Sequence, residues 1–229
     1  MSEKSERDAA GEIDRGTVVR MADEVAAGGA MPTVDRVFTE RGARAPVVRW
    51  SPAPETLPLD GHRFVLARWT AARAARPYPP ASAIDPFALK PVLGNIIILD
   101  VIDDGADFGF RLYGTTIAEA ARFDWTGSTV DEMRQVLKGP GPALYLATYR
   151  ALLRRPEPVY TTNSAMVVFE NRAWGRLVLP YGDAAAGRIE RILVANYVVS
   201  DDFVSDAEER RLARLREEMR SARRQGGPG

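Results

Sequence analysis

Arg111 is the side chain in this sequence with the clearest capacity for ligand chemistry. Its neighbours in the run 108–113 alternate, with Phe108, Phe110 and Leu112 on one side and Gly109, Arg111 and Tyr113 on the other. This period of two predicts a strand whose two faces differ. If the face of Arg111 looks into a space beneath helices, its guanidinium could hold a carboxylate or phosphate with paired hydrogen bonds. The alternative is an ion pair with an acid such as Asp124, which would pin the following turn.

A second set of candidates consists of aromatic and amide side chains. Aromatic walls with a few polar groups are typical of small-molecule sites. The same residues could instead be core aromatics and polar groups that satisfy one another across strands. The wider set comprises Tyr113, Trp125, Tyr145, Tyr149, Trp174, Tyr197, Asn163, Ser164 and Asn196. The predicted ligand site consists of Arg111, Tyr113, Trp125, Tyr145, Tyr149 and Asn196.

The residues that several kinds of catalysis need are missing or isolated. The chain has no cysteine, which excludes thiolate nucleophiles and thiolate metal sites. Its one histidine, His62, precedes the first core helix and is expected on the surface, so it offers Ser164 no base for a hydrolase triad. Asp103 and Asp104 are adjacent carboxylates, but Gly105 follows them in what is predicted to be a hairpin turn. We therefore expect no enzyme activity, no cofactor and no metal site.

Composition and charge limit the class of protein. A chain of 229 residues with 45% apolar residues can bury one core of ordinary size. Lysine plus arginine and aspartate plus glutamate number 31 each, so no net charge favours nucleic acid or an anionic membrane. No apolar run approaches the roughly 20 residues that span a bilayer. Residues 1–14 lack the basic start and apolar run of a signal peptide. We expect a cytoplasmic protein that binds neither nucleic acid nor membrane.

Hydrophobic periodicity and turn residues predict an alternation of strands and helices. Five strands are predicted, at 96–102, 108–113, 159–170, 173–181 and 188–200, the first two as a hairpin and the last three as an antiparallel meander. Between the two groups, capping boxes at Thr116 with Glu119 and at Thr129 with Glu132 predict two short helices. A stronger helix is predicted over 142–155. Apolar residues at helical spacing predict a helix over 63–75, and a charged helix is predicted over 205–224.

These elements suggest one domain with two appendages. Residues 1–60 are polar and rich in small residues, and their two short helical patterns have too little apolar surface to fold alone. We therefore expect a weakly ordered N-terminal arm and linker over 1–60, one domain over 61–200, and a charged helix with a disordered tail over 201–229. The expected fold class is α+β.

Three ordered motifs carry a resemblance to a known family. They are Ile84-Asp85-Pro86, the run from Phe110 to Thr115, and Asp124-Trp125-Thr126-Gly127, with Trp69, Pro80 and Leu93 between or before them. With these motifs in this order, the sequence resembles a PAS-like family common in alphaproteobacteria, over about residues 63–200. It departs from the family at Arg122-Phe123, where a glycine often stands. The resemblance implies a five-stranded antiparallel sheet covered on one face by short helices, and a sensory or regulatory module.

The resemblance also guides the expected function. Some PAS domains carry flavin or haem, but the usual flavin adduct needs a cysteine, and His62 is the only histidine available to a haem. We expect a stand-alone sensory domain that binds a small molecule or a partner protein and signals through flanking helices at 63–75 and 205–224. Those helices could also form a homodimer. The alternative is a structural adaptor with a filled core, which binds protein partners and no ligand.

Overall fold

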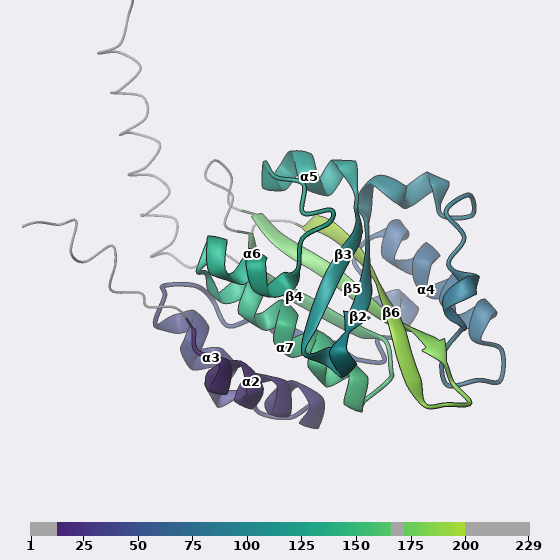
Figure 1. The fold of residues 1–229 in the computed structure, drawn as a ribbon. Helices are drawn as coiled ribbons and strands as arrows, with labels where there is room; N and C mark the ends of the chain where they lie inside the picture. The colour runs from purple at the N-terminus through teal and green to yellow at the C-terminus, as the bar shows by residue number, and fades with distance from the viewer. Residues whose placement is uncertain (1–12, 166–171, 200–229) are drawn as a thin grey trace, which may run out of the picture.

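The computed structural model describes residues 13–165 and 172–199, which form helices around one antiparallel sheet (Figure 1). The sheet has six strands in the order β1-β4-β5-β6-β2-β3. The strands are β1 (Val47–Trp50), β2 (Ile96–Ile102), β3 (Asp107–Tyr113), β4 (Val159–Ala165), β5 (Arg172–Asp183) and β6 (Arg188–Val199). The predicted α+β class is confirmed. The sheet has one strand more than expected because β1 pairs with β4 at its edge.

The predicted strand pairing agrees with the structure. Strands β2 and β3 form an antiparallel hairpin, and β4, β5 and β6 form the expected meander. The hairpin turn at Asp103, Asp104 and Gly105 has positive φ angles of 43°, 52° and 93°, which suit turn-forming residues. Residues 166–170 and 200, assigned to strands from the sequence, lie outside the described residues.

One face of the sheet is covered by α6 (Val130–Leu137) and α7 (Pro140–Arg154), while α5 (Thr115–Ala121) lies at the end of the sheet, against residues 90–95. Helix α7 is the central one of these, and residues from all around it are buried. Tyr149 packs edge-on against Phe108 of β3, with ring centroids 5.3 Å apart. A helix that is buried all round needs cover on the side away from the sheet.

That cover is supplied by α2 (Arg15–Ala27), so residues 13–50 differ from the weakly ordered arm expected over 1–60. Val18, Met21, Ala22 and Val25 of α2 are all 0% exposed, and they recur at helical spacing. The Arg134 guanidinium of α6 donates to the Ile13 carbonyl oxygen at 2.6 Å. The apolar stripe is too short to fold alone, but α7 gives it a surface to cover. Helix α3 (Pro32–Thr39) follows, with Val34, Val37 and Phe38 buried.

Helix α4 (Asp60–Arg73) lies on the other face of the sheet, opposite α7 (Figure 1). The Trp69 indole donates to the Pro180 carbonyl oxygen of β5 at 2.8 Å. This helix corresponds to the predicted helix at 63–75, and it docks on its own sheet. Trp69 is only 3% exposed and is therefore not available for contact with a second chain. The predicted helix at 205–224 lies outside the described residues.

Of the two capping boxes predicted from the sequence, one is present in the structure and one is not. Thr129 caps α6 and forms the predicted capping box with Glu132. The capping box predicted at Thr116 is wrong, because the N-cap of α5 is Gly114, two residues earlier, and no side chain caps this helix. Short 3-10 turns complete the described chain at η1 (Pro54–Thr56), η2 (Ala81–Ala83), η3 (Lys90–Asn95) and η4 (Asp103–Gly105).

Candidate functional site

Arg111 lies in an exposed ion pair on β3. Its Nε donates to both carboxylate oxygens of Asp100 on β2, at 2.8 and 3.0 Å, and its side chain is 53% exposed. Arg191 of β6 donates to the same carboxylate at 3.2 Å. The partner is thus Asp100 rather than Asp124, whose carboxylate accepts from the Thr126 amide within its own turn. The structure therefore places Arg111 away from the buried aromatic candidates.

A bulge in β3 separates Arg111 from Tyr113. Leu112 pairs with Ile98 and Phe110 pairs with Leu99, so Arg111 is the extra residue. A bulge shifts the alternation of side chains by one. Tyr113 consequently lies on the same face as Phe110, with ring centroids 5.5 Å apart, and not on the face of Arg111 as the period of two predicted.

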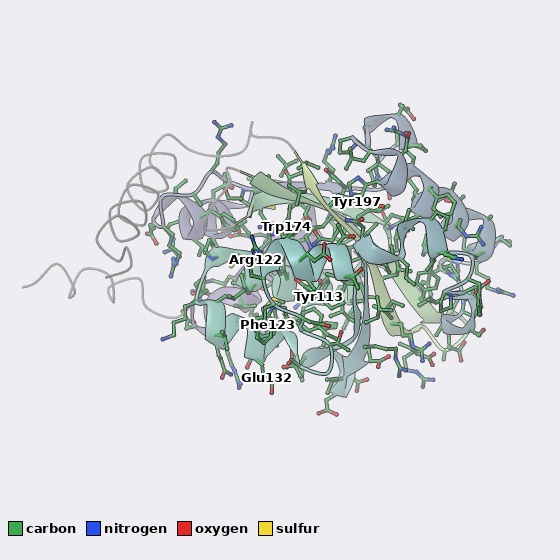
Figure 2. All side chains as sticks on the ribbon, turned by 90° about the horizontal axis from the view of Figure 1, so that it is seen from above. Tyr113, Arg122, Phe123, Glu132, Trp174 and Tyr197 are labelled. Atoms are coloured by element: carbon green, nitrogen blue, oxygen red, sulfur yellow. The ribbon has the colours of Figure 1, made fainter. Side chains whose placement is uncertain are left out.

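Beneath α7 the structure brings together a group of polar and aromatic side chains around a buried arginine, and we call this group the Arg176 cluster. Its members come from β3, α7, β4, β5 and β6: Tyr113, Tyr145, Tyr149, Asn163, Arg176 and Asn196. Four of them were in the ligand site predicted from the sequence, Asn163 was in the wider set, and Arg176 was not predicted. In Figure 2, which shows all side chains, Tyr113 lies near the middle of the molecule.

Arg176 holds this cluster together from β5. Its guanidinium carbon lies 3.6 Å from the centre of the Tyr145 ring and 5.5 Å from that of Tyr149, distances at which a cation is attracted to an aromatic face. Its Nη2 donates to the Tyr149 hydroxyl. Asn163 of β4 donates to the Tyr145 hydroxyl at 3.2 Å. Asn196 is directly opposite Arg176 on β6.

The charge on Arg176 is not neutralised by any carboxylate of residues 13–165 or 172–199. The residue is 2% exposed, and its Nε and Nη1 have no hydrogen-bond partner in that part of the chain. Arginine does not lose its proton in proteins, and leaving a charge buried without a partner costs on the order of several kcal/mol. The cluster therefore contains a buried cation with unused donors.

Among the described residues, the groups around Arg176 are uncharged, and two of them have unpartnered acceptor atoms. Burial raises the pKa values of the Tyr113 and Tyr149 hydroxyls, while the Arg176 charge acts in the opposite direction on both. These tyrosines consequently stay neutral at physiological pH. The Oδ1 atoms of Asn163 and Asn196 are also buried without a partner among the described residues. Buried polar atoms are normally paired, so the cluster has free acceptors beside its free donors.

Of the other sequence candidates, Trp174 lies beside the Arg176 cluster, directly opposite Asn163, and the rest are dispersed. Trp125 is 4% exposed and packs on Phe123 in the turn after α5, with ring centroids 4.5 Å apart. Trp174 of β5 is 8% exposed. Ser164 and Tyr197 point to the α4 face, because each is one residue from a member of the Arg176 cluster on its strand. Figure 2 labels Trp174 and Tyr197 on the sheet.

The prediction that His62 lies on the surface is wrong. Its side chain is 0% exposed, between α4 and the sheet, with its ring 4.7 Å from that of Tyr197 and 5.3 Å from that of Tyr160. Nε2 lies 3.1 Å from the Gly175 carbonyl oxygen. Burial lowers the pKa of the imidazole to about 4. The spacing of His62 from Val65, Leu66 and Trp69 is helical, and it could have indicated this burial.

Arg176 also has a signal in the sequence. It stands in the otherwise apolar run Ala173 to Leu179 of a strand that is covered on both faces, and a charged residue in such a strand is unusual.

Among the described residues, no cluster of side chains could hold a metal ion. In the same part of the chain, no helix is long and apolar enough to cross a membrane.

Comparison with known proteins agrees with the resemblance predicted from the sequence. Residues 60–138 match the family model described as a PAS domain. This segment runs from α4 to the end of α6, so the match ends before α7 and the three strands β4 to β6. A PAS domain indicates a sensory or regulatory module. A search of the curated proteins finds no match.

Solved structures are also similar to this chain. One is the PAS domain from Bordetella pertussis BvgS, with 19% sequence identity, coverage of 58% of this chain and 96% of that chain, and a TM-score of 0.38. Another is an RNA-binding light-oxygen-voltage receptor, with 14% identity, coverage of 88% of this chain and 52% of that chain, and a TM-score of 0.38.

Proposed function

We propose that this chain is a sensory or regulatory module that binds a small molecule at the Arg176 cluster. The observation that supports the proposal is the buried guanidinium of Arg176, whose Nε and Nη1 have no partner among residues 13–165 and 172–199. A ligand that accepts hydrogen bonds there would satisfy these donors and offset part of the cost of burying the Arg176 charge. The cluster lies between α7 and the sheet, where aromatic rings and a few polar groups converge, as in small-molecule sites.

The ligand would act by shifting a population of conformations. A molecule that contacts both Tyr145 of α7 and Arg176 of β5 favours the packing of α7 that brings these residues together. Helix α4 lies on the other side of β5, where His62 contacts the Gly175 carbonyl oxygen. In this proposal α4 and residues 205–224 pass the bound state to a partner protein or to a second copy of the chain. No reaction is part of the proposal.

Mass spectrometry of the purified full chain under native and denaturing conditions tests the binding step. A reproducible mass excess that disappears on denaturation supports the proposal. A thermal-shift screen with a library of small molecules covers ligands that are lost during purification. If neither experiment finds a binder, the proposal is refuted, and the structural adaptor with a filled core takes its place.

A matched pair of variants locates the site. Asn163→Leu removes an amide from the Arg176 cluster, and Arg111→Met removes an exposed arginine from the other face. Binding should weaken at least tenfold in the first variant, because a polar contact inside the cluster is lost, and stay unchanged in the second. Equal binding by both variants would show that the molecule binds elsewhere.

A further inference from the structure

The charge of the Arg176 cluster specifies the chemical class of its ligand. Arg176 is the only charged side chain in the cluster, whose other members are tyrosines and asparagines. A single guanidinium can neutralise one negative charge, and its planar fork matches a carboxylate. A phosphate group, with close to two negative charges at neutral pH, would leave excess charge buried in aromatic surroundings.

The walls of the cluster specify the body of the ligand. Tyr113 and Tyr149 are 9% and 0% exposed, and the centre of the Tyr145 ring lies 3.6 Å from the Arg176 guanidinium carbon. Such rings favour an apolar or aromatic body over a sugar or a polyol.

The start of α7 adds a second favourable feature for an anion. A Cβ atom placed on Gly141 would lie 3.3 Å from the Asn163 amide nitrogen and 3.4 Å from the Tyr145 hydroxyl, so the first turn of α7 lies directly beside the cluster. No side chain caps this helix. The N-terminal end of a helix carries partial positive charge, which favours a carboxylate nearby.

We infer that the ligand is a small organic monocarboxylate with an apolar or aromatic body, whose carboxylate pairs with the unused donors of Arg176. This inference rests on the proposed function. It goes further by stating which charge the ligand carries and which residue recognises it.

Isothermal titration of the full chain with charged and uncharged probes of the same shape tests the inference. The probes are benzoate, phenylacetate, 4-hydroxyphenylacetate and cinnamate, each against its primary amide, with phenyl phosphate as the other anion. At least one carboxylate should bind at least tenfold more tightly than its amide and than phenyl phosphate. Equal binding of acid and amide, preference for phenyl phosphate, or no binding by any carboxylate of the panel would overturn the inference.

Variants of Arg176 assign the recognition to this residue. Arg176→Met should weaken carboxylate binding at least tenfold, because a hydrogen-bonded ion pair is lost, and should leave amide binding unchanged. Arg176→Lys keeps the charge but loses the planar fork, and it should bind the carboxylate more weakly than the wild type. The lysine variant decides the question if circular dichroism shows that the methionine variant does not fold. Arg111→Met is the control and should bind as the wild type does.

The inference and the proposed function can fail separately. If native mass spectrometry finds a bound molecule that carries no acid group, the chain is still a ligand-binding module and the carboxylate assignment is overturned. If Arg176→Met and Arg176→Lys both bind a carboxylate as tightly as the wild type, the same conclusion follows. If no small molecule binds in any experiment, both the function and the inference fall.

Discussion

His62 makes the stability of this protein depend on pH in a way that can be calculated from its surroundings. The imidazole is fully buried, and its pKa falls from the ordinary 6.5 to about 4. The main cause is burial, which disfavours the charged form. The groups facing it are Tyr160 and Tyr197, whose own pKa values are raised, and Arg63, which carries the permanent charge of an arginine. None of these changes its charge between about pH 4 and about pH 8.

The sign follows from comparing the two states. In the folded protein His62 is neutral until the pH approaches 4, whereas in the unfolded chain it takes up a proton as the pH falls through 6.5. The unfolded state therefore binds more protons in this window, and stability decreases as the pH is lowered. The full difference of pKa corresponds to about 3 kcal/mol, of which about 2 kcal/mol is lost by about pH 5.

Urea unfolding of the wild type and of His62→Gln measures this term. Glutamine can still donate to the Gly175 carbonyl oxygen but does not titrate, so other groups cancel in the difference between the two proteins. Between about pH 7.5 and about pH 5 the wild type should lose about 2 kcal/mol more than the variant. Because the chain has one histidine, its NMR signal needs no assignment and gives the folded pKa directly. Parallel stability curves, or a folded pKa near 6.5, would refute the argument.

Four substitutions test the packing and the helix cap described above by urea unfolding. Met21→Ala in α2 should cost about 2 to 5 kcal/mol, because Met21 is fully buried; a cost below about 0.5 kcal/mol would mean that α2 is not part of the core. Thr129→Ala should cost about 1 kcal/mol through its cap, against less than about 0.5 kcal/mol for Thr116→Ala, and equal costs would contradict the assignment. Gly114→Ala should cost about 1 to 3 kcal/mol, since its Cβ would lie 2.3 Å from the Gly94 carbonyl oxygen; a neutral result would contradict this contact.

The sheet was largely predictable because its signals are local. The bounds of β2 agree with the predicted 96–102, and those of β3 differ by one residue, since turn residues and β-branched residues mark them. The face of Tyr113 was not predictable, because the bulge at Arg111 depends on how β3 pairs with β2. A period of two holds only while the pairing is regular.

The helices around the core show the same limit. The apolar stripe of α2 was visible in the sequence. Whether it is buried depends on contact with α7, which lies more than a hundred residues further along the chain. The ligand site was predicted only in part, because it too depends on contacts between elements that are far apart in the sequence. Tyr145 and Tyr149 could be assigned to one helix face, whereas Arg176 becomes important only because the fold buries it next to them.

The sequence did not predict the burial of His62 or of Arg176, and the two side chains lie on opposite sides of β5. This arrangement gives a final prediction. Gly175 and Arg176 are consecutive on β5, so a ligand that moves the Arg176 backbone also moves the Gly175 carbonyl oxygen, which lies 3.1 Å from the His62 ring. Binding of a carboxylate probe should therefore shift the NMR signal of the single histidine in the wild type and in Arg111→Met, and not in Arg176→Met. A histidine signal that stays unchanged at saturation would mean that the two faces are not coupled through β5, and α4 would then lose its assigned role in signalling even if the ligand binds.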